Sequence, residues 1–216
     1  MNRKVLFIGA ALVLFAAFVV GMLLYTSQRD EQAAQAVARS QASLARADAP
    51  TLGNPAAKVH IVEFLDPACE TCRVFFPLVK QIMANEPERI RLSVRHVALH
   101  AGSGEVVRLL EAARLQGKYW PTLERLLAAQ PMWVLNHTVH ADRVWPLLDG
   151  LGLDLEQLKR DVNSPEVAQR VALDAADAKA LNVTKTPEYF VNGRPLPSFG
   201  LEQLQGLVKD ALRSAY

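Results

Sequence analysis

The two cysteines of this 216-residue chain stand three positions apart in the stretch LDPACETC, which covers residues 65–72. The segment before them, VHIVEFL at 59–65, is apolar and β-branched, a pattern typical of a buried strand. After them, apolar residues recur at three- and four-residue spacings as far as Ile82, which predicts an amphipathic helix. The chain must therefore place Cys69 where a strand gives way to a helix, and Cys72 one turn further on.

The remaining patterns predict an α/β fold. Residues 90–97 (IRLSVRHV) indicate a second strand, so that strand, helix and strand form a βαβ unit with a right-handed crossover. Residues 104–181 carry helical patterns and no strand signal. A short strand is expected at 189–191, followed by an Asn-Gly turn at 192–193 and an amphipathic helix at 201–213.

The N-terminal part predicts a membrane anchor. Residues 5–25 (VLFIGAALVLFAAFVVGMLLY) run for 21 positions without a charge, and a helix of about 20 such residues spans a bilayer. Arg3 and Lys4 precede this single predicted transmembrane helix, which is expected to place everything after Tyr25 on the extracytoplasmic, periplasmic side of the inner membrane. A disulfide persists there. A cleaved signal peptide is the alternative, although its apolar core is usually only about 7–15 residues long.

These patterns divide the chain into four parts. Residues 1–25 are expected to form the cytoplasmic tip and the anchor, and residues 26–57, rich in Ala, Gln, Arg and Ser, a stalk. Residues 58–103 and 182–216 are expected to form the α/β domain, into which a helical block, 104–181, is inserted. The formal net charge of +2 gives no electrostatic footprint for nucleic acid, so no nucleic-acid partner is expected.

The spacing of the cysteine pair favours redox chemistry. The free N–H groups and the dipole of a helix N-terminus stabilise an anion, so Cys69 is expected to be an activated nucleophile. Cys72, inside the helix and less exposed, is expected to resolve a mixed disulfide. Two alternatives stay open: a pair of buried, inert thiols, and a metal site that uses both thiolates.

Three acidic or polar neighbours are expected to tune this pair. Glu70 and Thr71 stand between the cysteines, and a carboxylate beside a thiolate raises the thiol pKa by charge repulsion. Because the dipeptide offers no imidazole or cation, we expect a less oxidising couple than one with histidine in the gap. Glu63 shares a strand face with apolar residues, and burial there would let it exchange a proton with Cys72. An exposed acid at a strand edge is the alternative for Glu63.

Particular segments carry a family resemblance. VEFLDPACETCRVFFPLVKQI (62–82), TKTPEYFVNG (184–193) and the helical block between them resemble the DsbA-like family of thiol:disulfide oxidoreductases. The similarity covers residues 55–215. It implies a thioredoxin-like fold with an inserted α-helical domain, so the full predicted architecture is this α/β fold preceded by a single N-terminal transmembrane helix.

The resemblance also implies roles for individual residues. Cys69 matches the family's nucleophile, Cys72 its resolving cysteine, and Glu63 the buried acid beneath the disulfide. Pro187 matches the family's cis-proline, whose loop faces the cysteine pair. The backbone of Thr186 would pair with an extended substrate chain, and Thr186 would also donate a hydrogen bond to the Cys69 sulfur.

We therefore expect a thiol:disulfide oxidoreductase without a bound cofactor, in which the dithiol itself carries the electrons. Its expected partners are cysteine-containing client proteins, in oxidative folding, and a membrane redox partner. Glu70-Thr71 replaces the Pro-His of the best-known oxidases, which leaves open a reductase or isomerase that works in the reduced state. A copper-binding metallochaperone that uses the two thiolates is the alternative from a different class.

Histidine and tryptophan residues indicate no second site. The histidines fit no metal-binding motif, so solvated or core positions and no metal ligand are expected for His60, His96, His100, His137 and His140. The tryptophans all lie in the helical block, where we expect core packing, with an apolar groove for unfolded clients as the alternative, for Trp120, Trp133 and Trp145.

Overall fold

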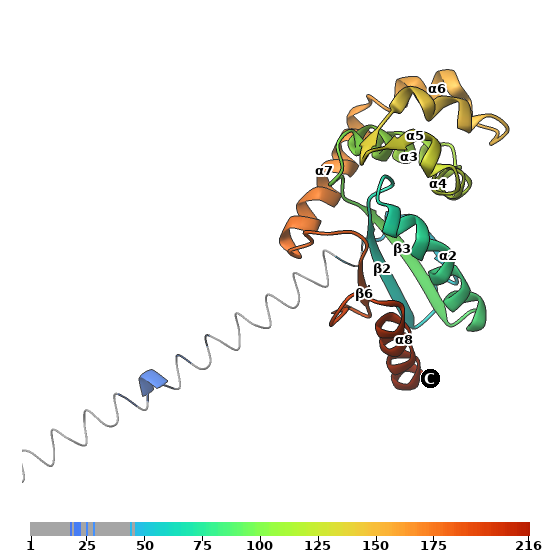
Figure 1. Cartoon of the computed structure of the whole chain (residues 1–216). Helices are drawn as coiled ribbons and strands as arrows, with labels where there is room; N and C mark the ends of the chain where they lie inside the picture. The colour runs from blue at the N-terminus through green and yellow to red at the C-terminus, as the bar shows by residue number, and fades with distance from the viewer. Residues whose placement is uncertain (1–17, 19, 23–24, 26–27, 29–43, 45) are drawn as a thin grey trace, which may run out of the picture. The chain divides into compact units, whose positions relative to one another are not determined.

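The computed structural model describes residues 18, 20–22, 25, 28, 44 and 46–216. Contacts between residues divide the chain into two units, Met1–Ala42 and Ser43–Tyr216. The second unit contains the sheet, the cysteine pair and the helices labelled in Figure 1.

A five-stranded sheet with the order β1-β3-β2-β6-β7 forms the centre of the second unit. β2 and β3 are parallel and are joined through helix α2, which confirms the predicted βαβ unit, and the other neighbouring strands are antiparallel. β2 is the middle strand, so the cysteine loop that follows it leaves the sheet at its centre. The strands are β1 (Thr51–Gly53), β2 (Val59–Leu65), β3 (Ile90–His96), β6 (Glu188–Val191) and β7 (Arg194–Pro195).

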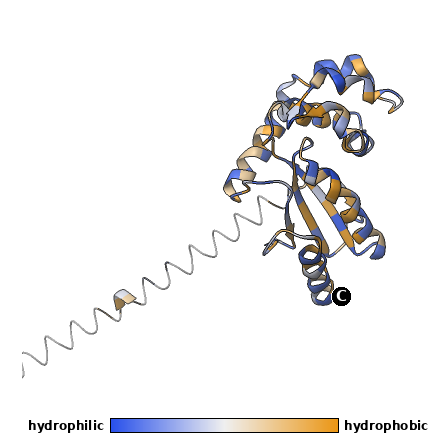
Figure 2. Cartoon of the chain, viewed as in Figure 1, coloured by the Kyte–Doolittle hydropathy of each residue, from blue (hydrophilic) through white to orange (hydrophobic). Residues whose placement is uncertain are grey.

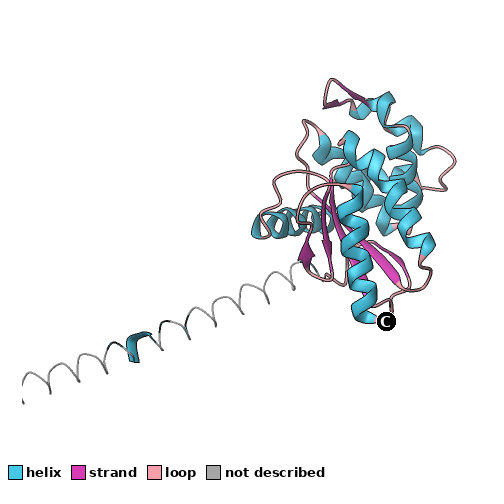
Figure 3. Ribbon diagram, turned by 60° about the horizontal axis from the view of Figure 1, so that its bottom comes forward, coloured by secondary structure: helices cyan, strands magenta, loops and turns pink. Residues whose placement is uncertain are grey.

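Helices cover both faces of this sheet, as Figure 3 shows. On one face Ile61 and Leu65 of β2 pack in the main core with α2 (Glu70–Asn85) and α8 (Leu201–Ala215). On the other face Val62, Phe64 and Phe190 form a smaller cluster with Leu44 and with Ala178 of α7 (Pro165–Ala180). Figure 2 shows the hydrophobic residues concentrated on the strands and on the helix surfaces beside them. The alternation along β2 thus decides which side chains reach the α2 face.

The helical block lies between β3 and β6 in the chain, at one end of the sheet (Figure 1). Its first helix, α3, and α4 contribute leucines to the main core, which is therefore continuous across the sheet and the insertion. The helical elements are α3 (Ser103–Leu115), α4 (Tyr119–Ala128), α5 (Gln130–Trp133), η1 (Ala141–Arg143), η2 (Trp145–Leu148), α6 (Leu155–Asp161) and α7 (Pro165–Ala180).

The insertion also contains a hairpin that the sequence analysis missed. β4 (Val134–Leu135) pairs with β5 (Thr138–Val139) in an antiparallel arrangement. Asn136 and His137 form the turn with positive φ angles of 50° and 60°. Runs of two residues are too short for a strand pattern, and the turn lacks the glycine that marks such hairpins.

The segment assigned to a stalk, residues 26–57, differs at its C-terminal end from the expectation. β1 lies within it and pairs with β3 as an antiparallel edge strand. Ala57 is buried as well, at 6% exposure. A run of three residues that follows Pro50 and ends in Gly53 gives almost no periodicity, so pairing with β3, and not the local pattern, makes it a strand.

The structure does not agree with the transmembrane helix predicted over residues 5–25. No helix among the described residues is long and apolar enough to cross a membrane. A span needs about 20 continuous apolar residues, whereas only positions 18, 20–22 and 25 of this segment are described and the others lie outside the described residues. This finding contradicts the predicted anchor and the single-pass, periplasmic location that depended on it.

A buried ion pair fixes α7 where it returns from the insertion to the sheet. Arg95 of β3, whose side chain is 1% exposed, donates to Asp174 at 2.7 Å and to Asp177 at 2.6 Å. Asp174 also accepts the backbone N–H of His96 at 2.8 Å. Because β3 ends beside the cysteine loop, these bonds fix that end of the sheet as well as the helix.

Replacing Arg95 with methionine should therefore lower the free energy of unfolding by about 3 kcal/mol, since Asp174 loses the buried guanidinium and Asp177 keeps the longer pair with Arg46, at 3.6 Å. Lys159→Met, which breaks an exposed pair with Glu156, should change it by less than about 1 kcal/mol. Urea denaturation of both variants measures the difference, and equal losses would contradict a stabilising role of the Arg95 pair.

Candidate active site

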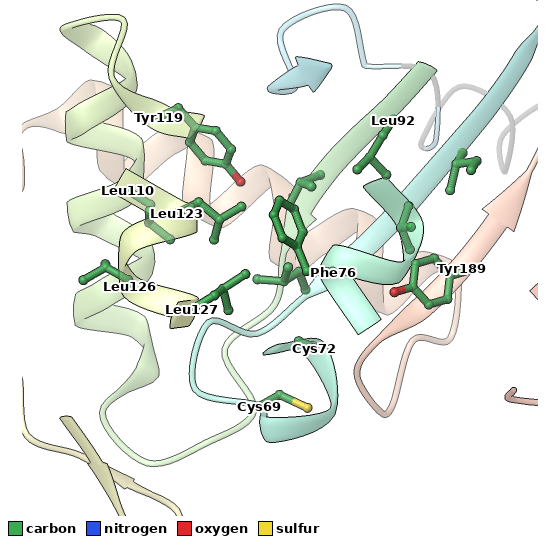
Figure 4. Close-up of a cluster of buried hydrophobic side chains, with 14 of the residues drawn as sticks. Cys69, Cys72, Phe76, Leu92, Leu110, Tyr119, Leu123, Leu126, Leu127 and Tyr189 are labelled. Carbon is green, nitrogen blue, oxygen red and sulfur yellow. The ribbon is translucent and has the colours of Figure 1, made fainter. Parts of the chain in front are cut away.

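Cys69 and Cys72 open helix α2. Cys69 is the N-cap, in extended conformation with φ −77° and ψ 119°, and the helix begins at Glu70. Both cysteines are free thiols and are buried, at 6% and 0% exposure. Figure 4 shows them at the first turn of α2, with Leu127 of α4 on one side and Tyr189 on the other. The placement predicted from the spacing is confirmed.

The thiol of Cys69 is strongly acidified. Its pKa is lowered from 9.0 to about 5, chiefly by a hydrogen bond with the Cys72 side chain. Hydrogen bonds from the Thr186 side chain and from the backbone N–H groups of Cys72 and Thr71 lower the pKa further, against the opposing effect of burial. Cys69 is therefore a thiolate at neutral pH, and the thiolate is the nucleophilic form of cysteine.

Cys72 has the opposite character. Burial raises the pKa of its thiol far above the ordinary value, and its hydrogen bond with Cys69 and the charges of Glu63 and Cys69 raise it further. Cys72 thus keeps its proton and donates it in a hydrogen bond to the Cys69 sulfur. The two thiols have distinct properties, one ionised and one neutral.

A loop from the far end of the chain faces the cysteine pair. The peptide bond between Thr186 and Pro187 is cis, as the family resemblance implies. Sγ of Cys69 lies 3.3 Å from the carbonyl oxygen of Thr186, although 117 positions separate the two residues. β6, which begins at Glu188, pairs with β2 and carries this loop to the cysteines. Both positions that the resemblance singled out therefore lie at the pair.

Glu63 of β2 lies in the core beneath the pair, at 0% exposure. Tyr189 donates its hydroxyl hydrogen to Oε1 of Glu63 at 3.1 Å, and Oε2 has no hydrogen-bond partner among the described residues. Burial raises the pKa of Glu63 to about 8, the hydrogen bond from Tyr189 opposes this, and the Cys69 charge adds to it. The structure thus excludes the exposed alternative, while proton exchange with Cys72 stays a prediction.

Asp66 organises the loop between β2 and the pair, and the sequence analysis missed it. Its fully buried carboxylate accepts the backbone N–H groups of Ala68 at 2.9 Å, Leu99 at 2.7 Å and His100 at 2.9 Å. It also accepts hydrogen bonds from the His100 ring and the Ser103 hydroxyl. An Asp-Pro step after a buried strand is a turn signal, but Leu99, His100 and Ser103 lie 33 to 37 positions from Asp66 and no local pattern reveals them as its partners.

The hairpin of the insertion brings an imidazole to the dipeptide between the cysteines. Nδ1 of His137 lies 3.4 Å from Oε1 of Glu70, and both side chains are exposed, at 75% and 52%. Such exposed pairs contribute less than about 1 kcal/mol and require a protonated imidazole. The dipeptide itself contains no imidazole, but the fold places one beside it.

Other side chains that the sequence analysis considered have structural surroundings. His96 is buried and hydrogen-bonds to Tyr119 at 2.8 Å, and His60 bonds to Ser93 at 2.8 Å. Trp133 is fully buried in the main core. Trp120 and Trp145 are partly buried and pack against that core. In the described part of the chain no three His, Cys, Asp or Glu side chains are grouped so that they could hold a metal ion.

An ionised cysteine at a helix N-terminus, a neutral partner behind it and a facing cis-proline loop define a dithiol redox centre on a thioredoxin-like sheet. The family model described as Thioredoxin matches residues 45–210. A thioredoxin-like oxidoreductase from Silicibacter pomeroyi DSS-3 is 34% identical, with a TM-score of 0.69, over 81% of this chain and 98% of that one. The chain belongs to this thioredoxin family and is an oxidoreductase, in agreement with the resemblance of its sequence to the DsbA-like enzymes.

Two further solved structures share the fold at lower identity. BdbD from Bacillus subtilis is 23% identical over 76% of this chain and 93% of that one, with a TM-score of 0.67. The α-DsbA1 protein of Wolbachia pipientis is 16% identical over 82% and 96% of the two chains, with a TM-score of 0.69.

A different kind of protein contains a similar segment. The Na(+)/H(+) antiporter NhaA of Herminiimonas arsenicoxydans is 32% identical over 140 residues, which are 65% of this chain and 22% of the antiporter. This chain thus spans about a fifth of the length of the curated relatives it matches.

The hydrogen bond from Cys72 can be tested by removing its donor. Cys72→Ala should raise the pKa of Cys69 by about one unit or more, whereas Cys72→Ser, which keeps an O–H donor, should raise it less. The rate of alkylation by iodoacetamide, measured against pH, reports the Cys69 thiolate in both variants. Equal pKa values in the alanine and serine variants would contradict the assigned role of this hydrogen bond.

The buried carboxyl of Glu63 should make stability depend on pH. In the unfolded chain Glu63 loses its proton near pH 4.5, but in the folded protein only near pH 8. Its contribution to stability is thus fully present below pH 4.5 and is lost as the pH rises toward 8, by up to about 1.4 kcal/mol per pH unit.

Oxidised protein isolates this effect, because Cys69 does not titrate in a disulfide. Urea unfolding between pH 5 and 8 should show that the stability of the wild type falls relative to that of Glu63→Gln as the pH rises, a comparison that cancels the shared titration of His60, whose pKa is lowered to about 4. Glu202→Gln, at an exposed position, is the matched control and should follow the wild type. Parallel curves for the wild type and Glu63→Gln would show that the carboxyl titrates normally.

Proposed function

We propose that this chain exchanges a Cys69–Cys72 disulfide with the cysteines of client proteins and that it works in the oxidising direction. The observation that carries the proposal is the position of Cys69 at the N-cap of α2, with its sulfur 3.3 Å from the Thr186 carbonyl, and the thiol pKa there is lowered to about 5. In this proposal the thioredoxin-like part, residues 58–103 and 182–216, carries the redox pair, and the insertion, 104–181, forms its surroundings. The dithiol itself carries the electron pair.

The first step is attack by a client thiolate on Sγ of Cys69 in the oxidised protein. A bond forms between the client sulfur and Cys69, and the Cys69–Cys72 bond breaks, with the electron pair leaving on Cys72. Cys72 favours the neutral thiol strongly, so it takes up a proton. Glu63, with a pKa of about 8 and an unbonded Oε2, is protonated at neutral pH and is the group proposed to supply that proton.

The second step resolves the mixed disulfide. A second client thiolate attacks the client sulfur, the client disulfide forms, and the bond to Cys69 breaks. Cys69 leaves readily in this step because its thiolate is stabilised by the hydrogen bonds from Cys72 and from the backbone. The client loses two electrons and the protein gains them, as a Cys69 thiolate and a Cys72 thiol.

Stabilisation of the reduced form sets the direction. A low thiol pKa lowers the free energy of the dithiol state relative to the disulfide, which makes the couple more oxidising. Glu70 acts against this through its charge, and His137 lies beside Glu70. The couple is accordingly proposed to be an oxidant, weaker than one with histidine between the cysteines.

The proposal requires a second partner that removes the electrons from the dithiol. The family resemblance leads us to propose a membrane redox protein for this role. Client recognition is proposed to use the loop at Thr186 and Pro187, where the backbone of an extended client segment would pair beside Cys69.

A peptide with two cysteines tests the proposed chemistry. Mixed with oxidised protein, the peptide should form its disulfide while the protein becomes reduced in equal amount. Mixed instead with the disulfide form of the peptide, Cys72→Ser should trap a mixed disulfide on Cys69, whose thiolate displaces one peptide sulfur, and Cys69→Ser should trap little or none on Cys72, because Cys72 is buried and protonated. The proposed mechanism would be contradicted if the protein and the peptide exchange no electrons, or if the mixed disulfide forms mainly at Cys72.

Direction is tested by the redox state of the pair in intact cells. Rapid acid quenching followed by alkylation separates disulfide from dithiol by mass. A mainly oxidised pair agrees with the oxidising direction, and a mainly reduced pair would show that the protein acts as a reductase or isomerase instead.

A further inference from the structure

A glutamine of the insertion lies against the cysteine loop. Gln130 is the first residue of α5 and is 1% exposed. Its place is fixed by Trp133 at the other end of the helix, which is fully buried and donates its ring N–H to the carbonyl of Leu126 at 2.9 Å. The side chain of Gln130 therefore projects from a rigid support and not from a mobile loop.

The amide of Gln130 makes three hydrogen bonds, all to the cysteine loop and α2. Its NH₂ group donates to the carbonyl oxygens of Pro67 at 2.8 Å and Cys69 at 3.0 Å. Its carbonyl oxygen accepts from Nε of Arg73 at 3.2 Å. The Gln130 side chain, 61 positions from Cys69 in sequence, thus bonds to Cys69 itself and to one residue on each side of it, Pro67 and Arg73.

These bonds act on the backbone that orients the nucleophile. The carbonyl of Cys69 also accepts the first helical hydrogen bond of α2, from the N–H of Arg73 at 3.2 Å. With its carbonyl held twice, Cys69 keeps the N-cap conformation in which its sulfur faces the N–H groups of Thr71 and Cys72. Hydrogen bonds weaken steeply with misalignment, so a small rotation of this residue would weaken thiolate stabilisation.

The chemistry of the contact requires an amide. Burying an unbonded amide costs about 1–3 kcal/mol, so a glutamine is favourable here only while its partners stay in place. Two carbonyl acceptors on one side and an arginine donor on the other match the two ends of the amide. Glutamate lacks the donors, and methionine of similar size has neither donor nor acceptor of comparable strength.

We infer that Gln130 is a positioning residue for thiol–disulfide exchange, through which the helical insertion holds Cys69 in the orientation that stabilises its thiolate. This inference rests on the proposed function in that it takes Cys69 as the nucleophile. It gives the insertion a direct role in setting the redox equilibrium.

Two variants test the inference. Gln130→Glu, which removes both donated hydrogen bonds and adds a negative charge, should shift the equilibrium with glutathione about tenfold toward the disulfide, or about 30 mV. It should also raise the thiol pKa of Cys69 by about one unit. Gln130→Met should act in the same direction by about threefold, because it removes the hydrogen bonds without adding a charge.

Gln116→Glu is the matched control. Gln116 lies in the same insertion, and its amide also bridges backbone groups, donating to the carbonyl of Asp154 at 3.1 Å and accepting its N–H at 2.8 Å. Its replacement should change the glutathione equilibrium by less than about twofold, even where it lowers the melting temperature by a similar amount.

The outcomes separate this inference from the proposed function. If the wild type exchanges with glutathione, and both Gln130 variants keep the wild-type equilibrium and the wild-type pKa of Cys69, the positioning role is wrong and the proposed function stands. Failure of both variants to fold would overturn it too, since Gln130 would then be a folding residue. If the wild-type protein does not exchange with glutathione at all, that result would instead contradict the proposed function.

Discussion

The hydrogen bond from the Cys72 thiol to the Cys69 sulfur is the interaction on which the chemistry of this protein depends. It is the largest cause of the lowered pKa of Cys69, and it requires Cys72 to stay protonated. The core around Cys72 ensures this, because burial and the charges nearby oppose its ionisation. Cys69 is therefore ionised because Cys72 keeps its proton and donates it in a hydrogen bond. The difference between the two thiols follows from the deeper burial of Cys72 in the fold.

The rest of the fold fixes the geometry that this hydrogen bond needs. β2, at the centre of the sheet, leads directly into the loop, and Asp66 holds that loop through five hydrogen bonds. β6 carries Thr186 and the cis-proline to the sulfur of Cys69. Glu63 lies beneath, bonded to the hydroxyl of Tyr189, as an acid whose pKa burial raises to about 8. The insertion contributes contacts at Glu70 and at the backbone of Cys69.

The sequence predicts much of this arrangement, because several determinants are local. The strand at 59–65, the helix end near Asn85 and the Asn192-Gly193 turn, with φ angles of 46° and 80°, all follow from short patterns. Burial of Glu63 follows from alternation on a strand with two covered faces. The cis bond at Pro187 was accessible only through the family resemblance, since no local pattern distinguishes cis from trans proline.

What the sequence could not predict depends on contacts between distant segments. Asp66 looks like an ordinary turn residue, and Gln130 like a surface glutamine before a proline, until the fold brings their partners within hydrogen-bond distance. The hairpin at Val134–Val139 and the edge strand β1 are too short to show a period and exist through pairing alone. The predicted anchor at 5–25 rested on hydropathy alone, and the described residues contain no membrane-spanning helix.

The most direct measurement is a titration of the reduced wild-type protein in which thiolate absorbance is followed from pH 3 to pH 10. One thiol should ionise with a midpoint near pH 5, and no second thiol should ionise before the end of the range. Two thiols that ionise together near pH 9, the ordinary value for cysteine, would contradict the asymmetry from which the chemistry was derived.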